Sequence, residues 1–174
     1  NTQLSYKELN EIAHELATRI PKVSENTNNN PKVDIENIYN NSWAVIIGIN
    51  DYTKSKPLKY AVNDALAINE MLINKFGFEN NNIKLLTNKE ATYFEIRKTL
   101  FDIAKLAEEN DRILVYFAGH GQTVSTEIDK MEIGYIIPVD GDINNPIQDG
   151  IPMDDIIRMG KLSKSKHMLF LMDA

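Results

Sequence analysis

From residue 43 onward, short apolar runs alternate along the chain with helical repeats of apolar residues. Four of the runs are typical of buried strands, namely residues 43–49, 83–86, 113–117 and 167–172. Between them, apolar residues three or four positions apart predict one helix that ends at Gly77 and a second that opens with the capping box Thr92–Glu95. Strands that alternate with helices imply right-handed crossovers. The pattern therefore predicts an α/β fold with a mostly parallel sheet and helices on both faces.

The stretch between the third and the last predicted strand is less regular. Residues 122–139 predict a hairpin that ends in Tyr135–Pro138, and a short helix is expected to open at Asp154. An Asp directly before a helical apolar repeat is a common N-cap, so Asp154 is expected to cap this helix.

The first 41 residues follow a different pattern. The capping box Ser5–Glu8 opens a helical repeat that Pro21 ends, which predicts one amphipathic helix over residues 1–21. Residues 22–41 hold seven Asn with Pro31 and scattered charges, and such a segment buries too little apolar area to offset its ordering entropy. We therefore predict an Asn-rich linker over residues 22–41 and the α/β domain over residues 42–174.

Composition excludes several classes of function. The 174 residues include 19 Lys and Arg against 25 Asp and Glu, a net charge of −6, so no nucleic-acid partner is expected. No apolar run reaches the roughly eighteen residues of a membrane span, and the first twenty residues lack the apolar core of a signal peptide. A cytoplasmic protein with no membrane partner is expected. The absence of cysteine excludes disulfides, thiolate metal ligands and a cysteine nucleophile within these residues.

The residues best suited to catalysis or ligand binding follow the carboxyl ends of the predicted strands, where the sites of parallel sheets usually lie. Asn50–Tyr52 follow the first strand, His120 follows the third between two glycines, and Asp173 closes the last. The flanking glycines permit unusual dihedral angles and close approach to a ligand. Spacing alone leaves three interpretations of His120 open: a catalytic base, a hydrogen-bonded structural histidine, or a metal ligand without a second His or Cys nearby.

An ordered set of motifs resembles the caspase-like cysteine peptidases, and within them the metacaspase-type prokaryotic branch. The set comprises WAVIIGIN at 43–50, Asn63-Asp64-Ala65, YFAGHG at 116–121, Ile137–Asp140 and LFLMDA at 169–174. The resemblance covers about residues 42–174 and implies a caspase-like fold. In that family the nucleophilic cysteine directly follows the Asp-Ala position. The chain is therefore expected to be the large-subunit portion of a cysteine endopeptidase, with the C-terminal small-subunit portion of the same protein as its partner.

The same resemblance implies roles for individual residues. His120 would activate the thiol and protonate the leaving amine, while the backbone N–H of Gly121, together with that of the cysteine, would stabilise the oxyanion. Asp64 and Asp173 match a carboxylate pair that selects Arg or Lys before the cut in a protein or peptide substrate. The simpler interpretation of Asp64 is a solvated carboxylate in the first turn of a helix. The simpler interpretation of Asp173 is a polar residue that ends a buried strand. The aspartate-specific branch would instead need a cation here, for which Lys59 is the nearby candidate.

Two further possibilities complete the expectations. Asp154 and Asp155 resemble a calcium-binding carboxylate pair of some metacaspase-type enzymes, which leaves calcium as an alternative. A hard cation needs six or more oxygens, and Asp154 is expected to cap its helix, so the preferred expectation is that no cofactor is used. A catalytically inert caspase-like domain that acts by protein–protein contact is the main alternative function, and the residue that follows Ala174 would distinguish the two. A phosphate-accepting receiver domain is not expected, because it needs two acidic residues after the first strand and only Asp51 is found there. A nucleotide-binding domain is not expected either, because the sequence has no glycine-rich phosphate-binding motif.

Overall fold

The computed structural model describes residues 38–125 and 131–174, all within one compact unit of the chain. The predicted N-terminal helix and nearly all of the predicted linker lie outside the described residues. Over the part of the chain that is described, no helix is long and apolar enough to cross a membrane.

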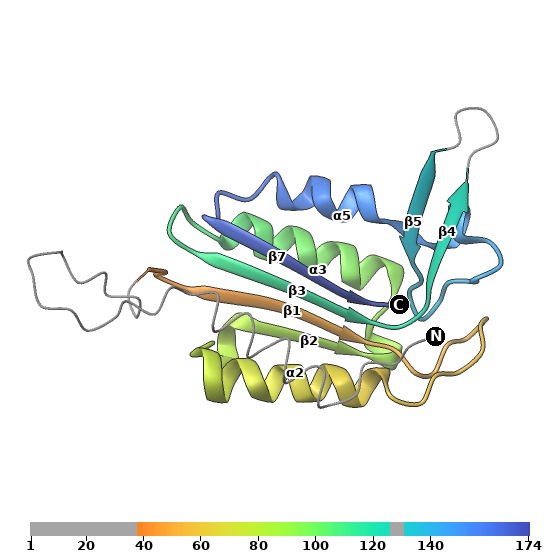
Figure 1. Cartoon of the computed structure of the whole chain (residues 1–174), viewed down its shortest axis with the longest axis horizontal. Coiled ribbons are helices and arrows are strands. Elements are labelled where there is room, and N and C mark those ends of the chain that lie inside the picture. Colours follow the sequence, from red (N-terminus) through yellow and green to blue (C-terminus); the bar gives the residue numbers. More distant parts are fainter. Residues whose placement is uncertain (1–37, 126–130) are drawn as a thin grey trace, which may run out of the picture. The chain divides into compact units, whose positions relative to one another are not determined.

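Four parallel strands form the central sheet in the order β2–β1–β3–β7 (Figure 1). The strands are β1 (Ser42–Gly48), β2 (Ile83–Thr87), β3 (Arg112–Ala118) and β7 (His167–Asp173). They coincide with the four apolar runs of the sequence, and β3 pairs with β1 on one side and with β7 on the other. The predicted α/β class and parallel sheet are confirmed.

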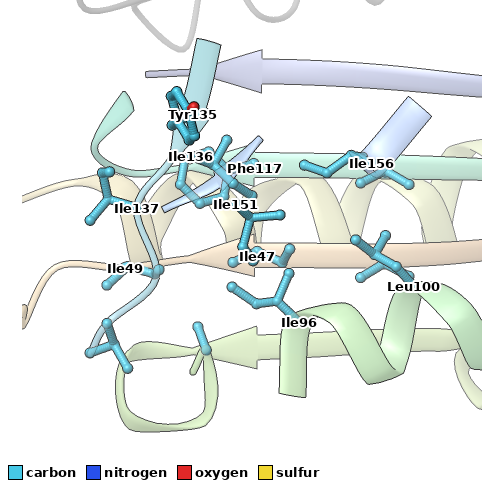
Figure 2. Close-up of a cluster of buried hydrophobic side chains, with 14 of the residues drawn as sticks. Ile47, Ile49, Ile96, Leu100, Phe117, Tyr135, Ile136, Ile137, Ile151 and Ile156 are labelled. Atoms are coloured by element: carbon cyan, nitrogen blue, oxygen red, sulfur yellow. The ribbon is translucent and has the colours of Figure 1, made fainter. Parts of the chain in front are cut away.

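Alternate residues of each strand point to opposite faces of this sheet, so apolar side chains lie on both faces. Helices cover both faces and bury these side chains. Helix α2 (Ala61–Phe76) packs on one face, and α3 (Tyr93–Leu106) and α5 (Met153–Gly160) pack on the other. Ile46 and Tyr116 contribute to the α2 side, whereas Ile47 and Phe117 contribute to the α3 side. Figure 2 shows the α3 side, where Ile96 and Leu100 of α3 and Ile156 of α5 meet side chains of β1, β3 and the second sheet.

The ends of the helices follow the predicted signals. Gly77 adopts a left-handed conformation with φ of 69°, and its N–H bonds to the carbonyl of Leu72 to close α2. The Thr92 hydroxyl accepts from the Glu95 N–H at 3.2 Å, which caps the start of α3. Two short 3₁₀ turns, Asn80–Asn82 and Asn88–Glu90, flank β2.

A second, antiparallel sheet projects beyond the carboxyl end of β3 (Figure 1). It contains the predicted hairpin, as β4 (Gly121–Ser125) and β5 (Glu132–Ile136), and the unpredicted β6 (Ile151–Pro152). The four-residue helix α4 (Pro146–Asp149) was also missed, because elements this short show no periodicity.

The prediction that Asp154 caps the short helix was wrong. Helix α5 begins at Met153, and its N-cap is Pro152 in an extended conformation, with no side-chain cap bond. Strand β6 leads directly into the helix, so the extended residue before the first turn is the last residue of that strand. Asp154 instead lies exposed within the first turn, where its charge interacts favourably with the helix dipole.

A close contact between α2 and β1 positions the helix at the carboxyl end of the sheet. A Cβ atom at Gly48 would lie 2.6 Å from the Ala65 Cβ and 2.7 Å from the Ala61 carbonyl oxygen. Only a residue without a side chain therefore permits this approach. The first turn of α2, which carries Asp64, is thereby held against the end of the central sheet.

Candidate active site

Three strand ends meet at one edge of the central sheet. Backbone pairing continues just past the strands, because the Ile49 N–H donates to the Ala118 carbonyl at 3.0 Å and the Gly119 N–H donates to the Asp173 carbonyl at 3.1 Å. The segment after β1, the segment after β3 and the end of β7 are therefore neighbours, and the predicted residues His120 and Asp173 lie at the same edge.

The His120 side chain is held on two sides by the segment that follows β1. The Tyr52 hydroxyl accepts the His120 backbone N–H at 2.7 Å, and the two rings lie 4.6 Å apart at an angle of 42°. The His120 Nε2 atom lies 2.7 Å from the Lys56 carbonyl oxygen. A carbonyl oxygen can only accept, so Nε2 carries the hydrogen. In the neutral imidazole, Nδ1 is then the nitrogen that can take up a proton.

Both glycines that flank His120 are required by close packing. A Cβ atom at Gly119 would lie 2.5 Å from the Tyr52 hydroxyl oxygen and 2.7 Å from Cζ of Phe117. At Gly121, a Cβ atom would lie 2.7 Å from the Ala174 Cβ. The first glycine makes room for the tyrosine that holds His120, and the second brings Ala174 against the backbone next to the histidine.

The backbone N–H of Gly121 is not used by the hairpin. The Ile137 N–H donates to the His120 carbonyl at 2.9 Å, and the β4–β5 register places Gly121 opposite Ile136. Hydrogen-bonded and non-hydrogen-bonded pairs alternate along an antiparallel ladder, so the Gly121–Ile136 pair is non-hydrogen-bonded. The Gly121 N–H therefore points away from β5, at the edge where Ala174 lies.

The predicted acidic pair comes together on the α2 side of this edge. Asp173 pairs with Ala118 and Ala118 pairs with Gly48, so these three residues form the last row of the sheet. Asp64 lies in the first turn of α2, next to Ala65, which packs against Gly48 of this row. Burial raises the pKa of Asp64, and the negative charge of Asp173 raises it further. The Asp64 carboxyl thus lies within the electrostatic influence of Asp173.

The segment that carries Tyr52 and Lys56 is fixed from outside by Asn88. The Asn88 side-chain oxygen accepts the backbone N–H groups of Asn50 at 2.8 Å and of Asp51 at 3.1 Å, and its amide donates to the Asp51 carboxylate at 2.8 Å. Asn88 has φ of 42°, a left-handed conformation that Asn tolerates better than other side chains do. These contacts shape the start of the segment that holds His120.

Sequence reasoning missed Lys56, and it noted Tyr52 only as part of the segment after the first strand, without its contact to His120. Lys56 contacts the histidine through its main-chain carbonyl, so its side chain carries no signal in the sequence. Tyr52 did carry a signal, because it is a buried aromatic residue three positions after the end of the first predicted strand. A residue there could have been placed beside the strand end that carries His120.

The carboxylates considered for calcium lie elsewhere and are engaged differently. Asp155 forms ion pairs with Arg97 at 2.8 Å and with Arg158 at 3.9 Å, and Asp154 is exposed. Among residues 38–125 and 131–174, no group of three or more His, Cys, Asp or Glu side chains is arranged to hold a metal ion. Lys59, the cation of the alternative specificity, is exposed shortly before α2.

Comparison with known proteins places this geometry in a family. The family model of the caspase domain, peptidase C14, matches residues 41–174. The chain belongs to the caspase domain family. The caspase-like fold and the resemblance to metacaspases noted in the sequence are therefore confirmed.

Curated relatives of this caspase domain are metacaspases. Metacaspase-7 of Arabidopsis thaliana is 31% identical over 115 residues, which cover 61% of this chain and 28% of that protein. Metacaspase-1 of Eremothecium gossypii is 27% identical over 143 residues, which cover 77% of this chain and 31% of that protein. The chain thus spans about a third or less of the length of the curated relatives it matches.

A solved structure shares the fold. The crystal structure of protein GSU0716 from Geobacter sulfurreducens has a TM-score of 0.61 and 15% sequence identity, and the match covers 75% of this chain and 49% of that chain.

Proposed function

We propose that the full-length protein is a cysteine endopeptidase of the metacaspase type that cleaves after Arg or Lys, with His120 as its catalytic base and acid. The observation that carries the proposal is the clamped imidazole at the carboxyl edge of the sheet. Because the Lys56 carbonyl engages Nε2, the basic nitrogen Nδ1 is available to accept the proton of a thiol and later to protonate the leaving amine. The nucleophile would be a cysteine that directly follows Ala174.

The surroundings of Gly121 support an oxyanion site next to that cysteine. The Gly121 N–H is outside the β4–β5 ladder, and the glycine packs against Ala174. An oxygen that becomes negative in the transition state could accept from this N–H and from the N–H of the following cysteine. Each such donor is typically worth about 3 kcal/mol of transition-state stabilisation.

The open edge of the central sheet supports a small-subunit portion as partner. Strand β7 pairs only with β3 among the residues that the structure describes, and it is less buried than β1, with Leu169 42% exposed. An edge strand with this apolar character favours addition of a further strand. We infer that the C-terminal portion of the same protein continues the sheet there.

We also propose that the chemistry uses no metal or cofactor and that the protein works in the cytoplasm.

Replacement of His120 tests the catalytic assignment. In the full-length protein, His120→Ala should lower kcat on peptide substrates by about two to four orders of magnitude, the usual contribution of general acid–base catalysis. His167→Ala is the matched control, because His167 lies at the opposite end of β7. A His120→Ala protein that keeps its full rate would contradict the proposal. A residue other than cysteine after Ala174, with binding but no cleavage, would favour the inert interaction module.

The acidic pair supports specificity for basic residues, and a substrate panel tests it. Arg before the cut should be cleaved fastest, Lys should follow, and Asp should be near background. Asp64→Asn should lower the specificity constant for Arg by about thirtyfold or more, because a buried charge that loses its partner costs about 2–5 kcal/mol. Asp102→Asn, on the exposed side of α3, is the control.

The pH dependence of cleavage provides a second test of the pocket. The pKa of Asp64 is raised, so Asp64 should lose its charge at a higher pH than an ordinary Asp as the solution is acidified. Cleavage after Arg should fall in that range, and Asp64→Asn should remove that part of the acid limb. A preference for Asp that Lys59→Ala abolishes would instead identify the aspartate-specific branch.

A further inference from the structure

Tyr116 carries a buried hydroxyl that has no hydrogen-bond partner. The residue is 2% exposed, and its hydroxyl is the one buried side-chain polar atom without a partner in the described part of the chain. An unpaired buried hydroxyl lowers stability, and phenylalanine would fill the same space without that cost. The hydroxyl therefore needs an explanation other than the packing of the ring.

The place of Tyr116 in the sheet points to the acidic pair. Tyr116 lies between Ile46 and Leu171, two rows behind the row that contains Ala118 and Asp173, and therefore on the same α2 face. Burial raises the pKa of the Tyr116 hydroxyl, and the charges of Asp173 and then Asp64 raise it further. The uncharged Tyr116 hydroxyl thus interacts electrostatically with both carboxylates but donates a hydrogen bond to neither.

We propose that Tyr116 is a positioning residue for the acidic pair, and that its hydroxyl donates a hydrogen bond to Asp173 when a basic side chain occupies the pocket. This inference rests on the proposed specificity for Arg and Lys. In the free protein, the two carboxylates repel each other. A bound guanidinium or ammonium group offsets that repulsion, donates to some of the carboxylate oxygens and displaces water from the others, so the remaining oxygens need new donors. The Tyr116 O–H is an uncharged donor behind Asp173 that can meet this need without competing for the cation.

A purely structural role for Tyr116 predicts the opposite pattern of effects. If the hydroxyl only contributed to folding, its removal would lower stability and affect every substrate through loss of folded protein. If it supports the carboxylates during binding, its removal should leave the ligand-free protein as stable as before or more stable, and should weaken the binding of basic substrates.

The test compares Tyr116→Phe with wild type in the full-length protein. Kinetics with peptides that differ only in Arg or Lys before the cut should show KM raised by about tenfold or more for both, as for a lost hydrogen bond to a charged group, with little change in kcat. The melting temperature without substrate should not fall, and alkylation of the nucleophile by a small neutral reagent should keep its rate. Tyr39→Phe, which removes a hydroxyl that contacts His167 at the other end of the sheet, is the matched control.

The outcomes separate this inference from the proposed function. A wild-type protein that shows no preference for basic residues overturns the proposed specificity and this inference with it. A wild-type protein that prefers Arg and Lys, together with a Tyr116→Phe variant of unchanged KM, overturns only the role of Tyr116. A variant with lower stability and proportionally lower kcat would show that the hydroxyl is structural and would also overturn the inference.

Discussion

Replacing Tyr52 by phenylalanine tests whether the histidine works because its backbone is clamped. The change removes one oxygen atom and leaves the ring that contacts the imidazole. That oxygen accepts the His120 N–H at 2.7 Å, so the variant leaves a partly buried donor without its acceptor. Such a loss costs about 1–3 kcal/mol. For a domain of this size, the melting temperature should fall by roughly 2–12 °C.

The effect on catalysis should exceed what stability alone would cause. The Tyr52 hydroxyl also lies only 2.5 Å from where a Cβ atom at Gly119 would be, so it contacts the backbone on both sides of the peptide bond between Gly119 and His120. A displacement of a catalytic group by about 1 Å can cost about a hundredfold in rate. We therefore expect kcat to fall by about ten- to a hundredfold in the Tyr52→Phe variant, with KM nearly unchanged.

The assay uses steady-state kinetics with an Arg substrate and thermal unfolding monitored by circular dichroism, both on the full-length protein at a temperature where the variant is folded. Tyr39→Phe serves as the control for loss of a tyrosine hydroxyl. A Tyr52→Phe variant with wild-type kcat and wild-type melting temperature would show that the backbone of His120 needs no clamp, and the interpretation of this segment would be wrong.

Two other predictions concern the supports of the fold and the site. Asn88→Ala should lower kcat severalfold with little change in KM, because the N–H groups of Asn50 and Asp51 lose their acceptor. Steady-state kinetics measures both constants, and an unchanged kcat would show that the segment keeps its shape without Asn88. Asp111→Asn should lower the free energy of unfolding at neutral pH by about 1–3 kcal/mol. Burial raises the pKa of Asp111, but N–H donors that include Trp43 Nε1 at 3.0 Å outweigh burial and lower it. Its stabilisation is therefore complete above the unfolded pKa of about 3.9 and is lost as the pH falls through the lower folded value, so urea unfolding of the variant should depend less on acid pH.

The central sheet could be predicted from the sequence because each of its strands is an apolar run. A strand such as β1 shows a continuous apolar run, and a helix such as α2 shows one apolar stripe with Gly77 at its end. The second sheet was predicted only as a hairpin. Its third strand, β6, has two residues and pairs with β5 through contacts that no local pattern encodes.

Residues at the ends of predicted strands could be located from the sequence, whereas the main-chain carbonyl that contacts His120 could not. His120 and Asp173 stood at strand ends in the sequence, and parallel pairing places them at one edge. The Lys56 carbonyl depends on the path of a long connecting segment, which is determined by contacts with Asn88 and with Val139, whose carbonyl accepts the Thr53 N–H at 3.0 Å. Such contacts between distant segments leave no periodic signal in the sequence.

The register between β3 and β7 supports the proposed location of the nucleophile. Ala118 lies opposite Asp173 and the Gly119 N–H donates to the Asp173 carbonyl at 3.1 Å, so the position after Ala174 adjoins the segment that carries His120. Neighbouring strands are about 4.8 Å apart, a separation that one short side chain and an imidazole can span. A residue at that position would also have its backbone beside Gly121, which already packs against Ala174. In the proposed enzyme, a residue directly after Ala174 would therefore lie beside the segment that carries His120, and the identity of its side chain would determine whether the site could cleave a peptide.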